Sequence, residues 1–254
     1  MKPAGNTVEE MWARQQISGS DVNYDLWGQK RKSLIEMSAI SRSCIFTVDV
    51  YKGTYDYASD SFEDVFGVRS GLLKTVEKQG DLIEDLIHPA DRDKLIDLQI
   101  RHGEFIYSLA PEERNDYRTI YQVRMRNARN QYINVTSRQQ VIETDQNGKA
   151  WIVMGMMEVS PDQTPMDRVK CSVLNLKTGT FFNPYAASKD QMLTGREREI
   201  LSLIHKGFLS KEIAGRLDVS IHTINNHRKN ILAKLEADNA IEAINTARGA
   251  GLID

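Results

Sequence analysis

The sequence has few cysteines and no long apolar run, and both absences narrow the class of protein. Its two cysteines, Cys44 and Cys171, lie far apart with no CxxC pairing, so neither a disulfide framework nor a zinc site is encoded. We interpret both as small buried residues. No stretch approaches the roughly 18 consecutive apolar residues that a membrane span requires, and residues 1–16 lack the apolar core of a signal peptide. We therefore expect a cytoplasmic protein with no membrane partner.

The chain also lacks a strong net charge and a catalytic signature. A formal net charge of −2 gives no overall attraction to nucleic acid, so any such binding must come from a local basic surface. The sequence has no nucleophile elbow, phosphate-binding loop, dinucleotide fingerprint or HExxH motif, and its five histidines show no metal-ligand spacing. We therefore expect neither an enzyme nor a metal site.

The composition is that of a folded globular protein, with 41% hydrophobic and 27% charged residues in a chain of 254 residues. This length favours two moderate domains. Residues 1–43 are polar and helix-prone. They predict a flanking helix that buries a narrow stripe of Tyr24, Trp27, Leu34 and Ile35.

Residues 44–59 predict a β-hairpin, because two short alternating segments flank a turn at Lys52 and Gly53. A helical stretch follows over residues 61–104. We expect several short helices there, because the stretch is interrupted at Gly67, Gly71, Gly80 and Pro89. Asp91 is placed to cap the helix that follows Pro89.

Three strong strand signals come next, namely TIYQVRMRN, QYINVTSRQQVIE and KAWIVMGMMEV, and turn residues separate them. In the first, Tyr121, Val123 and Met125 alternate with polar side chains, which is the pattern of a sheet with one buried and one solvent-exposed face. The order of two strands, short helices and three strands, together with the IHPADR motif at residues 87–92, resembles a PAS domain over residues 44–160. The resemblance implies an antiparallel sheet with flanking helices, acting as a sensor or a pairing module.

The PAS-like region leaves the question of a ligand open. An apolar stripe of side chains could line a pocket, but a stripe of this kind is more typical of plain core; it consists of Met125, Trp151, Met154, Met156 and Met157. His88 stands beside a proline at a helix start, which favours a structural role over haem ligation. We assign no cofactor and leave open an unidentified small-molecule ligand.

Residues 161–190 predict a structured connector. The segment carries Pro161, Pro165 and Pro184, together with a small hairpin signal around SVLNLKTGTFF.

Residues 191–254 contain clear signals for the start and end of several helices. Thr194 and Glu197 form a capping box and Gly207 ends the first helix. Ser210 can cap a second, short helix, and Ser220 can cap a third over residues 221–235. A fourth helix opens at 239–242. We expect an all-α domain of four helices.

The third of these helices has two faces. Ile221, Ile224, Ile231 and Leu235 share one side, while His222, Asn225, Asn226 and Lys229 share another. The helix contains Arg228, Lys229 and Lys234 and no acidic residue, so it supplies the local cationic patch that the overall charge does not.

The segments LTGREREILSLIHKG, KEIAGRLDVS, HTINNHRKNILAKL and AINTARGAGLI resemble the LuxR-type helix-turn-helix domain over nearly its full length. The resemblance implies that residues 221–235 enter the major groove of double-stranded DNA and that residues 239–248 pair two protomers, so we expect a homodimer.

The resemblance also implies roles for single residues. Asn225, Asn226 and Lys229 would contact bases, and family members often carry lysine at the position of Asn225. Lys211, Ser220 and Thr223 sit at helix starts where phosphates are bound. The full set of candidate DNA-binding residues is Lys211, Ser220, His222, Thr223, Asn225, Asn226, His227, Arg228 and Lys229. His227 borders the buried stripe, so it either packs or holds a phosphate.

The sequence thus predicts an α+β protein, with a PAS-like sheet followed by a four-helix LuxR-type domain. The leading hypothesis is a one-component transcription regulator whose PAS-like domain senses a signal or mediates dimerisation. The alternative is a ligand-free PAS-like module that recruits a partner protein to DNA.

Overall fold

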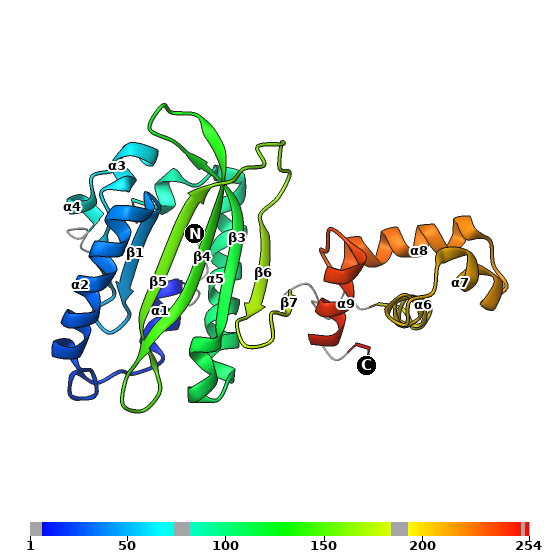
Figure 1. Cartoon of the computed structure of the whole chain (residues 1–254), viewed down its shortest axis with the longest axis horizontal. Helices are drawn as coiled ribbons and strands as arrows, with labels where there is room; N and C mark the ends of the chain where they lie inside the picture. Colours follow the sequence, from blue (N-terminus) through cyan, green and yellow to red (C-terminus); the bar gives the residue numbers. More distant parts are fainter. Residues whose placement is uncertain (1–6, 74–81, 184–192, 250–251, 254) are drawn as a thin grey trace. The chain divides into compact units, whose positions relative to one another are not determined.

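The computed structural model describes residues 7–73, 82–183, 193–249 and 252–253. The chain divides into two compact units, residues 1–171 and residues 172–254 (Figure 1). Among the described residues, no helix combines the length and the apolar character that crossing a membrane would need. The predicted break at Gly80 and the connector's Pro184 lie outside the described residues.

Unit 1 is built on an antiparallel sheet whose strand order is β2-β1-β5-β4-β3. The strands are β1 (Cys44–Asp49), β2 (Thr54–Ala58), β3 (Tyr117–Arg126), β4 (Tyr132–Thr144) and β5 (Ala150–Val159). The predicted hairpin and three-stranded meander are therefore confirmed. Gly53, in the turn between β1 and β2, and Gly148, in the turn between β4 and β5, have φ of 67° and 76°, in the left-handed region that favours glycine. Both cysteines are buried, as the sequence predicted.

One face of the sheet carries the predicted short helices: α3 (Ser61–Phe66), α4 (Ser70–Leu73), the 3-10 turn η2 (Glu84–Leu86) and α5 (Pro89–Ser108). Tyr121, Val123 and Met125 of β3 are buried toward this face, as their alternation predicted. The cap of α5 differs from the prediction. His88 is the N-cap, and its Nδ1 accepts from the backbone N of Ala90. Asp91 instead binds Arg124, because it is the third residue inside the helix and not the residue that precedes it.

The N-terminal segment forms two helices rather than the single one expected: α1 (Val8–Ala13) and α2 (Tyr24–Ser41), with the short 3-10 turn η1 (Gly19–Asp21) between them. Helix α1 packs against α5. Helix α2 covers the opposite face of the sheet, where Trp27 packs on Trp151 and Ile152 (Figure 1). Of the predicted stripe, Ile35 is exposed, because it lies on the side of α2 turned away from this cluster.

Unit 2 contains the four helices that the capping and helix-ending residues predicted: α6 (Gly195–His205), α7 (Ser210–Arg216), α8 (Ile221–Lys234) and α9 (Ala240–Gly249). They surround one apolar cluster that includes Ile200, Ile213, Ile224 and Ile231. The predicted hairpin is present as β6 (Lys170–Asn175) paired with β7 (Phe181–Phe182). The α+β class is confirmed, whereas the finer boundaries at residues 43, 160 and 190 stay predictions.

Candidate functional site

Local capping interactions fix the helices of unit 2. The Thr194 Oγ1 accepts from the Glu197 backbone N at 3.2 Å, and the Glu197 carboxylate accepts from the Thr194 backbone N at 2.7 Å. Gly207 has φ of 88°, which ends the α6 region in the left-handed conformation that glycine tolerates. Ser220 caps α8, since its Oγ accepts from the Thr223 backbone N at 3.0 Å.

The cap of α7 corrects the prediction. Ser210 is the first helical residue, and Leu209 occupies the N-cap position. Leucine has no side-chain acceptor, so only the reciprocal half of a capping box is present, in which the Glu212 carboxylate accepts from the Leu209 backbone N at 2.8 Å.

Helix α8 separates a buried face from an exposed one, as its sequence predicted. Ile224 and Ile231 are fully buried and Leu235 follows them into the core. Ile221 is the exception, because at the first helical position it is 46% exposed. The opposite side of α8 exposes His222, Asn225, Asn226 and Lys229.

The remaining candidate DNA-binding residues lie at or near this exposed face with different degrees of burial. Ser220 is exposed, and Thr223, His227 and Arg228 are half-buried, while Lys211 is exposed in the first turn of α7. The Arg228 Nη1 donates to the Ser210 Oγ at 3.4 Å, which ties α8 to the start of α7. The structure thus brings the α8 candidates together on one helix and places Lys211 on the neighbouring one.

Lys234 does not belong to this exposed cationic face, although its sequence position suggested that it did. Its Nζ donates to the Glu197 Oε2 at 2.8 Å, and the Glu197 side chain is only 4% exposed. Burial acts to raise the pKa of Glu197, but the hydrogen bonds from Lys234 and Thr194 outweigh it and hold that pKa below its usual value. The basic side chains left on α8 are Arg228 and Lys229.

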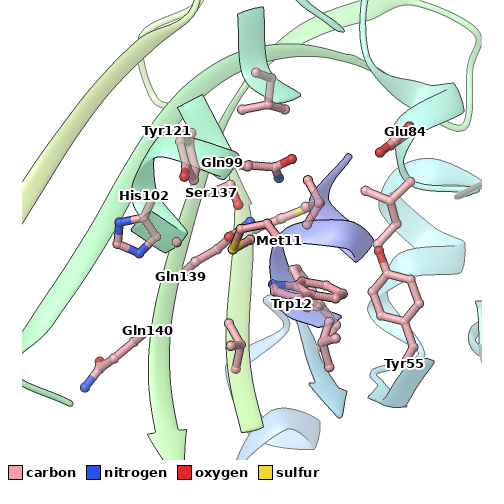
Figure 2. Close-up of a pocket in the computed structure, with 18 of the residues that line it drawn as sticks. Met11, Trp12, Tyr55, Glu84, Gln99, His102, Tyr121, Ser137, Gln139 and Gln140 are labelled. Carbon is pink, nitrogen blue, oxygen red and sulfur yellow. The ribbon is translucent and has the colours of Figure 1, made fainter. Parts of the chain in front are cut away.

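Unit 1 encloses a second candidate site, a cavity of about 470 Å³ between the inner face of the sheet, α5 and α1 (Figure 2). Its apolar wall includes Val123, Met125, Val153 and Met157. Two methionines of the predicted stripe therefore reach the cavity. Met154, Met156 and Trp151 do not line it, and Trp151 packs edge-on against Tyr24 at 5.1 Å on the other face.

Polar groups concentrate on one side of the cavity, where Gln99, His102, Tyr121, Ser137 and Gln139 lie close together in Figure 2. Ser137 is 3% exposed, and its Oγ has no hydrogen-bond partner within the described part of the chain. The His102 ring bonds the Thr119 Oγ1 at 2.7 Å. Burial lowers the pKa of His102 to about 3, so the ring is neutral at ordinary pH.

Helix α1 closes part of the cavity wall through Val8, Met11 and Trp12. It approaches α5 closely at Gly103, where a Cβ would lie 2.0 Å from the Met11 Sδ. The Gln15 side chain fastens the end of this segment, donating to the Tyr107 hydroxyl at 2.7 Å and accepting from the Ala150 backbone N at 2.9 Å. Sequence reasoning missed the contribution of α1 to the cavity, because the patterns that it singled out supply only Tyr121, Val123, Met125 and Met157 to the lining.

Comparison with known proteins identifies the C-terminal domain. Residues 191–247 match the family model described as bacterial regulatory proteins, luxR family. Residues 191–247 form a LuxR-family helix-turn-helix domain. The match leaves the N-terminal region outside the family model.

Curated relatives match over the same region. The chain is 48% identical over 65 residues to the uncharacterized response regulatory protein YgeK of Escherichia coli, covering 26% of this chain and 44% of that protein. It is 46% identical over 54 residues to the response regulator protein VraR of Staphylococcus aureus, covering 21% of this chain and 26% of that protein. The chain thus spans less than half the length of these relatives.

Solved structures align over more of the chain at low identity. The phage VqmA-DPO complex aligns over 89% of this chain and 91% of that one, with 18% identity and a TM-score of 0.34. The Vibrio cholerae VqmA dimer aligns over 87% of this chain and 90% of that one, with 16% identity and a TM-score of 0.34. The N-terminal domain of a diguanylate cyclase with a PAS/PAC sensor from Marinobacter aquaeolei covers 46% of this chain and 94% of that one, with 14% identity and a TM-score of 0.35.

Proposed function

We propose that the protein is a sequence-specific DNA-binding transcription regulator and that α8 is its recognition helix, which enters the major groove. The observation that carries this proposal is the exposed face of α8, where amide, imidazole and cationic side chains stand together on a helix with no acidic residue. Such a face can bond base edges and attract phosphates at once. Asn226 and Asn225 would read bases, and the start of the helix with Ser220 and Thr223 would meet a phosphate.

The regulator acts as a homodimer in this proposal, with α9 pairing the protomers as the family resemblance implies. Ile241 supports this role, because it is 72% exposed on α9 while Ala243 and Ala247 of the same helix are buried. Two recognition helices would then read two half-sites.

Unit 1 is the sensor of the proposed regulator, and the cavity is its ligand site. A cavity of about 470 Å³ with an apolar wall and a few convergent polar groups has the character of a small-molecule site. The buried Ser137 hydroxyl supports this assignment, because a buried polar group without a partner costs stability that a ligand can recover. A cavity filled by side chains would instead have favoured the partner-recruiting alternative.

The DNA proposal is tested by selecting binding sequences from a randomised duplex with the full-length protein. In titrations on the enriched sequence, Asn226→Ala should cost about 1–3 kcal/mol and relax preference at one position of each half-site. Lys229→Ala should reduce the slope of log K against log salt by about 0.9. Lys32→Ala removes an exposed lysine from α2 in unit 1, so it serves as the matched charge control. Unchanged titrations for both α8 variants would show that the exposed face of α8 does not contact the bases.

The sensing proposal is tested by native mass spectrometry of the full-length protein purified without additives. A dimer that carries a discrete extra mass, lost in Ser137→Ala, supports a bound small molecule. A dimer of the bare chain mass after mild purification, with DNA affinity indifferent to cell extract, would favour the partner-recruiting alternative.

A further inference from the structure

Two side chains on the exposed face of α8 are within hydrogen-bond distance of each other in the absence of DNA. The Asn226 Nδ2 lies 3.2 Å from the His222 Nε2, and both side chains are exposed. The two residues are four positions apart, which places them on the same side of a helix one turn from each other. Since Asn226 is the central base reader of the proposed function, its orientation matters for specificity.

The hydrogen-bonding asymmetry of an amide makes this contact informative. The side chain of asparagine accepts at one end and donates two hydrogen bonds at the other, and the two ends are nearly equal in shape. An imidazole nitrogen that accepts a hydrogen bond can hold only the donating end. With one N–H of Asn226 directed to the His222 ring, the carbonyl oxygen and the second N–H stay available.

This remaining pair is the acceptor and donor combination that adenine requires in the major groove, where N6 donates and N7 accepts. The reversed amide would point both of its N–H groups away from His222. It would then suit the two acceptors of guanine, O6 and N7. The neighbour of Asn226 therefore decides which base its amide matches.

We propose that His222 is a positioning residue that holds Asn226 in its adenine-reading orientation and thereby sets base preference at one position of each half-site. The proposal rests on the DNA-binding function given above. It assigns to His222 a role in specificity that does not depend on its own contact with a base.

Three substitutions at position 222 separate the hydrogen-bond role from the shape of the side chain. His222→Ala removes the partner, so the amide can turn toward either base. Preference for adenine at the base that Asn226 contacts should then fall about two- to tenfold, which corresponds to the net free energy of one hydrogen bond. His222→Glu offers acceptors alone on a helix-compatible side chain, so it should keep the preference for adenine while its negative charge lowers affinity for every DNA sequence. His222→Lys offers donors alone, so it should hold the carbonyl end and move the preference from adenine toward guanine.

A double-mutant cycle distinguishes positioning from direct contact. In the Asn226→Ala background, His222→Ala should change neither the affinity nor the base preference, because the group that it positions is gone. Equal losses in the two backgrounds would show that His222 reads DNA itself, and they would overturn the proposal. Circular dichroism of each variant verifies that α8 is intact, since both residues are exposed.

The experiment uses the full-length protein and the randomised duplex, with the base preference of each variant read from the enriched sequences. If the wild-type protein enriches no sequence, both the proposed function and this inference fall. If the wild type enriches a motif, Asn226→Ala relaxes one position of it and His222→Ala leaves that position unchanged, only the positioning role is overturned. Relaxation by alanine with retention by glutamate is the expected result.

Discussion

Replacing Lys234 by methionine would break the contact between the end of α8 and the start of α6. The Lys234 Nζ donates to the Glu197 carboxylate at 2.8 Å, and the lysine side chain is 31% exposed against 4% for the glutamate. Methionine retains most of the lysine stem and its helix propensity but not its charge. The variant therefore leaves a buried carboxylate with the Thr194 backbone N as its remaining partner in the described region.

The size of the loss follows from the burial of the carboxylate. Removing one partner of a fully buried pair costs about 3–5 kcal/mol, and a partly exposed lysine contributes less because water screens it. We expect Lys234→Met to lower the free energy of unfolding of unit 2 by about 2 kcal/mol at pH 7. Lys229→Met, an exposed change on the same helix, should alter it by less than about 0.5 kcal/mol.

The loss should depend on pH in a defined direction. Although burial alone would raise it, the native pKa of Glu197 lies below its ordinary value because Lys234 and Thr194 bond the carboxylate. A depressed native pKa gives stability that is present above the unfolded pKa, which is about 4.3 for glutamate, and that is lost as pH falls through the native pKa. The difference between wild type and Lys234→Met should therefore be full at pH 7 and shrink in acid.

Urea unfolding followed by two signals provides the assay. The three tryptophans, Trp12, Trp27 and Trp151, all belong to unit 1, so their fluorescence reports that unit, whereas far-ultraviolet circular dichroism reports helices of both. We expect Lys234→Met to shift the circular dichroism transition and to leave the fluorescence transition in place. An unchanged circular dichroism midpoint at pH 7 would refute the view that this ion pair stabilises the domain.

Three further predictions concern unit 1. Gly103→Ala places a methyl group 2.0 Å from the Met11 Sδ and should cost about 1–3 kcal/mol, with faster amide exchange along α1; unchanged exchange would contradict the close approach. Asp91→Asn removes the charged partner of Arg124, whose Nε donates to Asp91 Oδ2 at 2.9 Å, and should cost about 3 kcal/mol in thermal unfolding. The depressed pKa of His102, about 3 because of burial, means that the native state binds fewer protons than the unfolded chain. Stability should therefore fall below pH 6.5 by up to about 1.4 kcal/mol per pH unit, and His102→Gln should flatten that slope in urea titrations.

Most of the fold was accessible from the sequence, because the decisive signals are local. The alternation of Tyr121, Val123 and Met125 fixes which face of β3 is buried, and the reciprocal capping of Thr194 and Glu197 marks the start of α6. Errors arose where several residues compete for one role. The cap of α5 is His88 and not Asp91, and a pattern of residue types alone does not decide between neighbouring acceptors.

The interaction of Lys234 with Glu197 illustrates what local patterns cannot supply. The two residues are 37 positions apart, and each one read alone has a sensible exposed role on its own helix. Only the packing of α6 against α8 brings them together, so a cationic residue that counts toward a DNA-binding patch in the sequence instead pairs with a buried carboxylate of another helix. The same reasoning applies to the cavity, because part of its wall comes from α1, which packs against the distant helix α5 at Gly103.

The cavity is large enough and polar enough to bias a two-state equilibrium in the proposed regulator. A ligand changes DNA affinity only by the difference in its binding free energy for the two states. A tenfold change in DNA affinity needs a difference of about 1.4 kcal/mol. One hydrogen bond to the buried Ser137 hydroxyl, formed in one state and absent in the other, contributes about 0.5–1.5 kcal/mol. A ligand that makes this bond in only one state would therefore change DNA affinity by about two- to tenfold. DNA affinity that depends on ligand in wild type and not in Ser137→Ala is the result that this coupling requires.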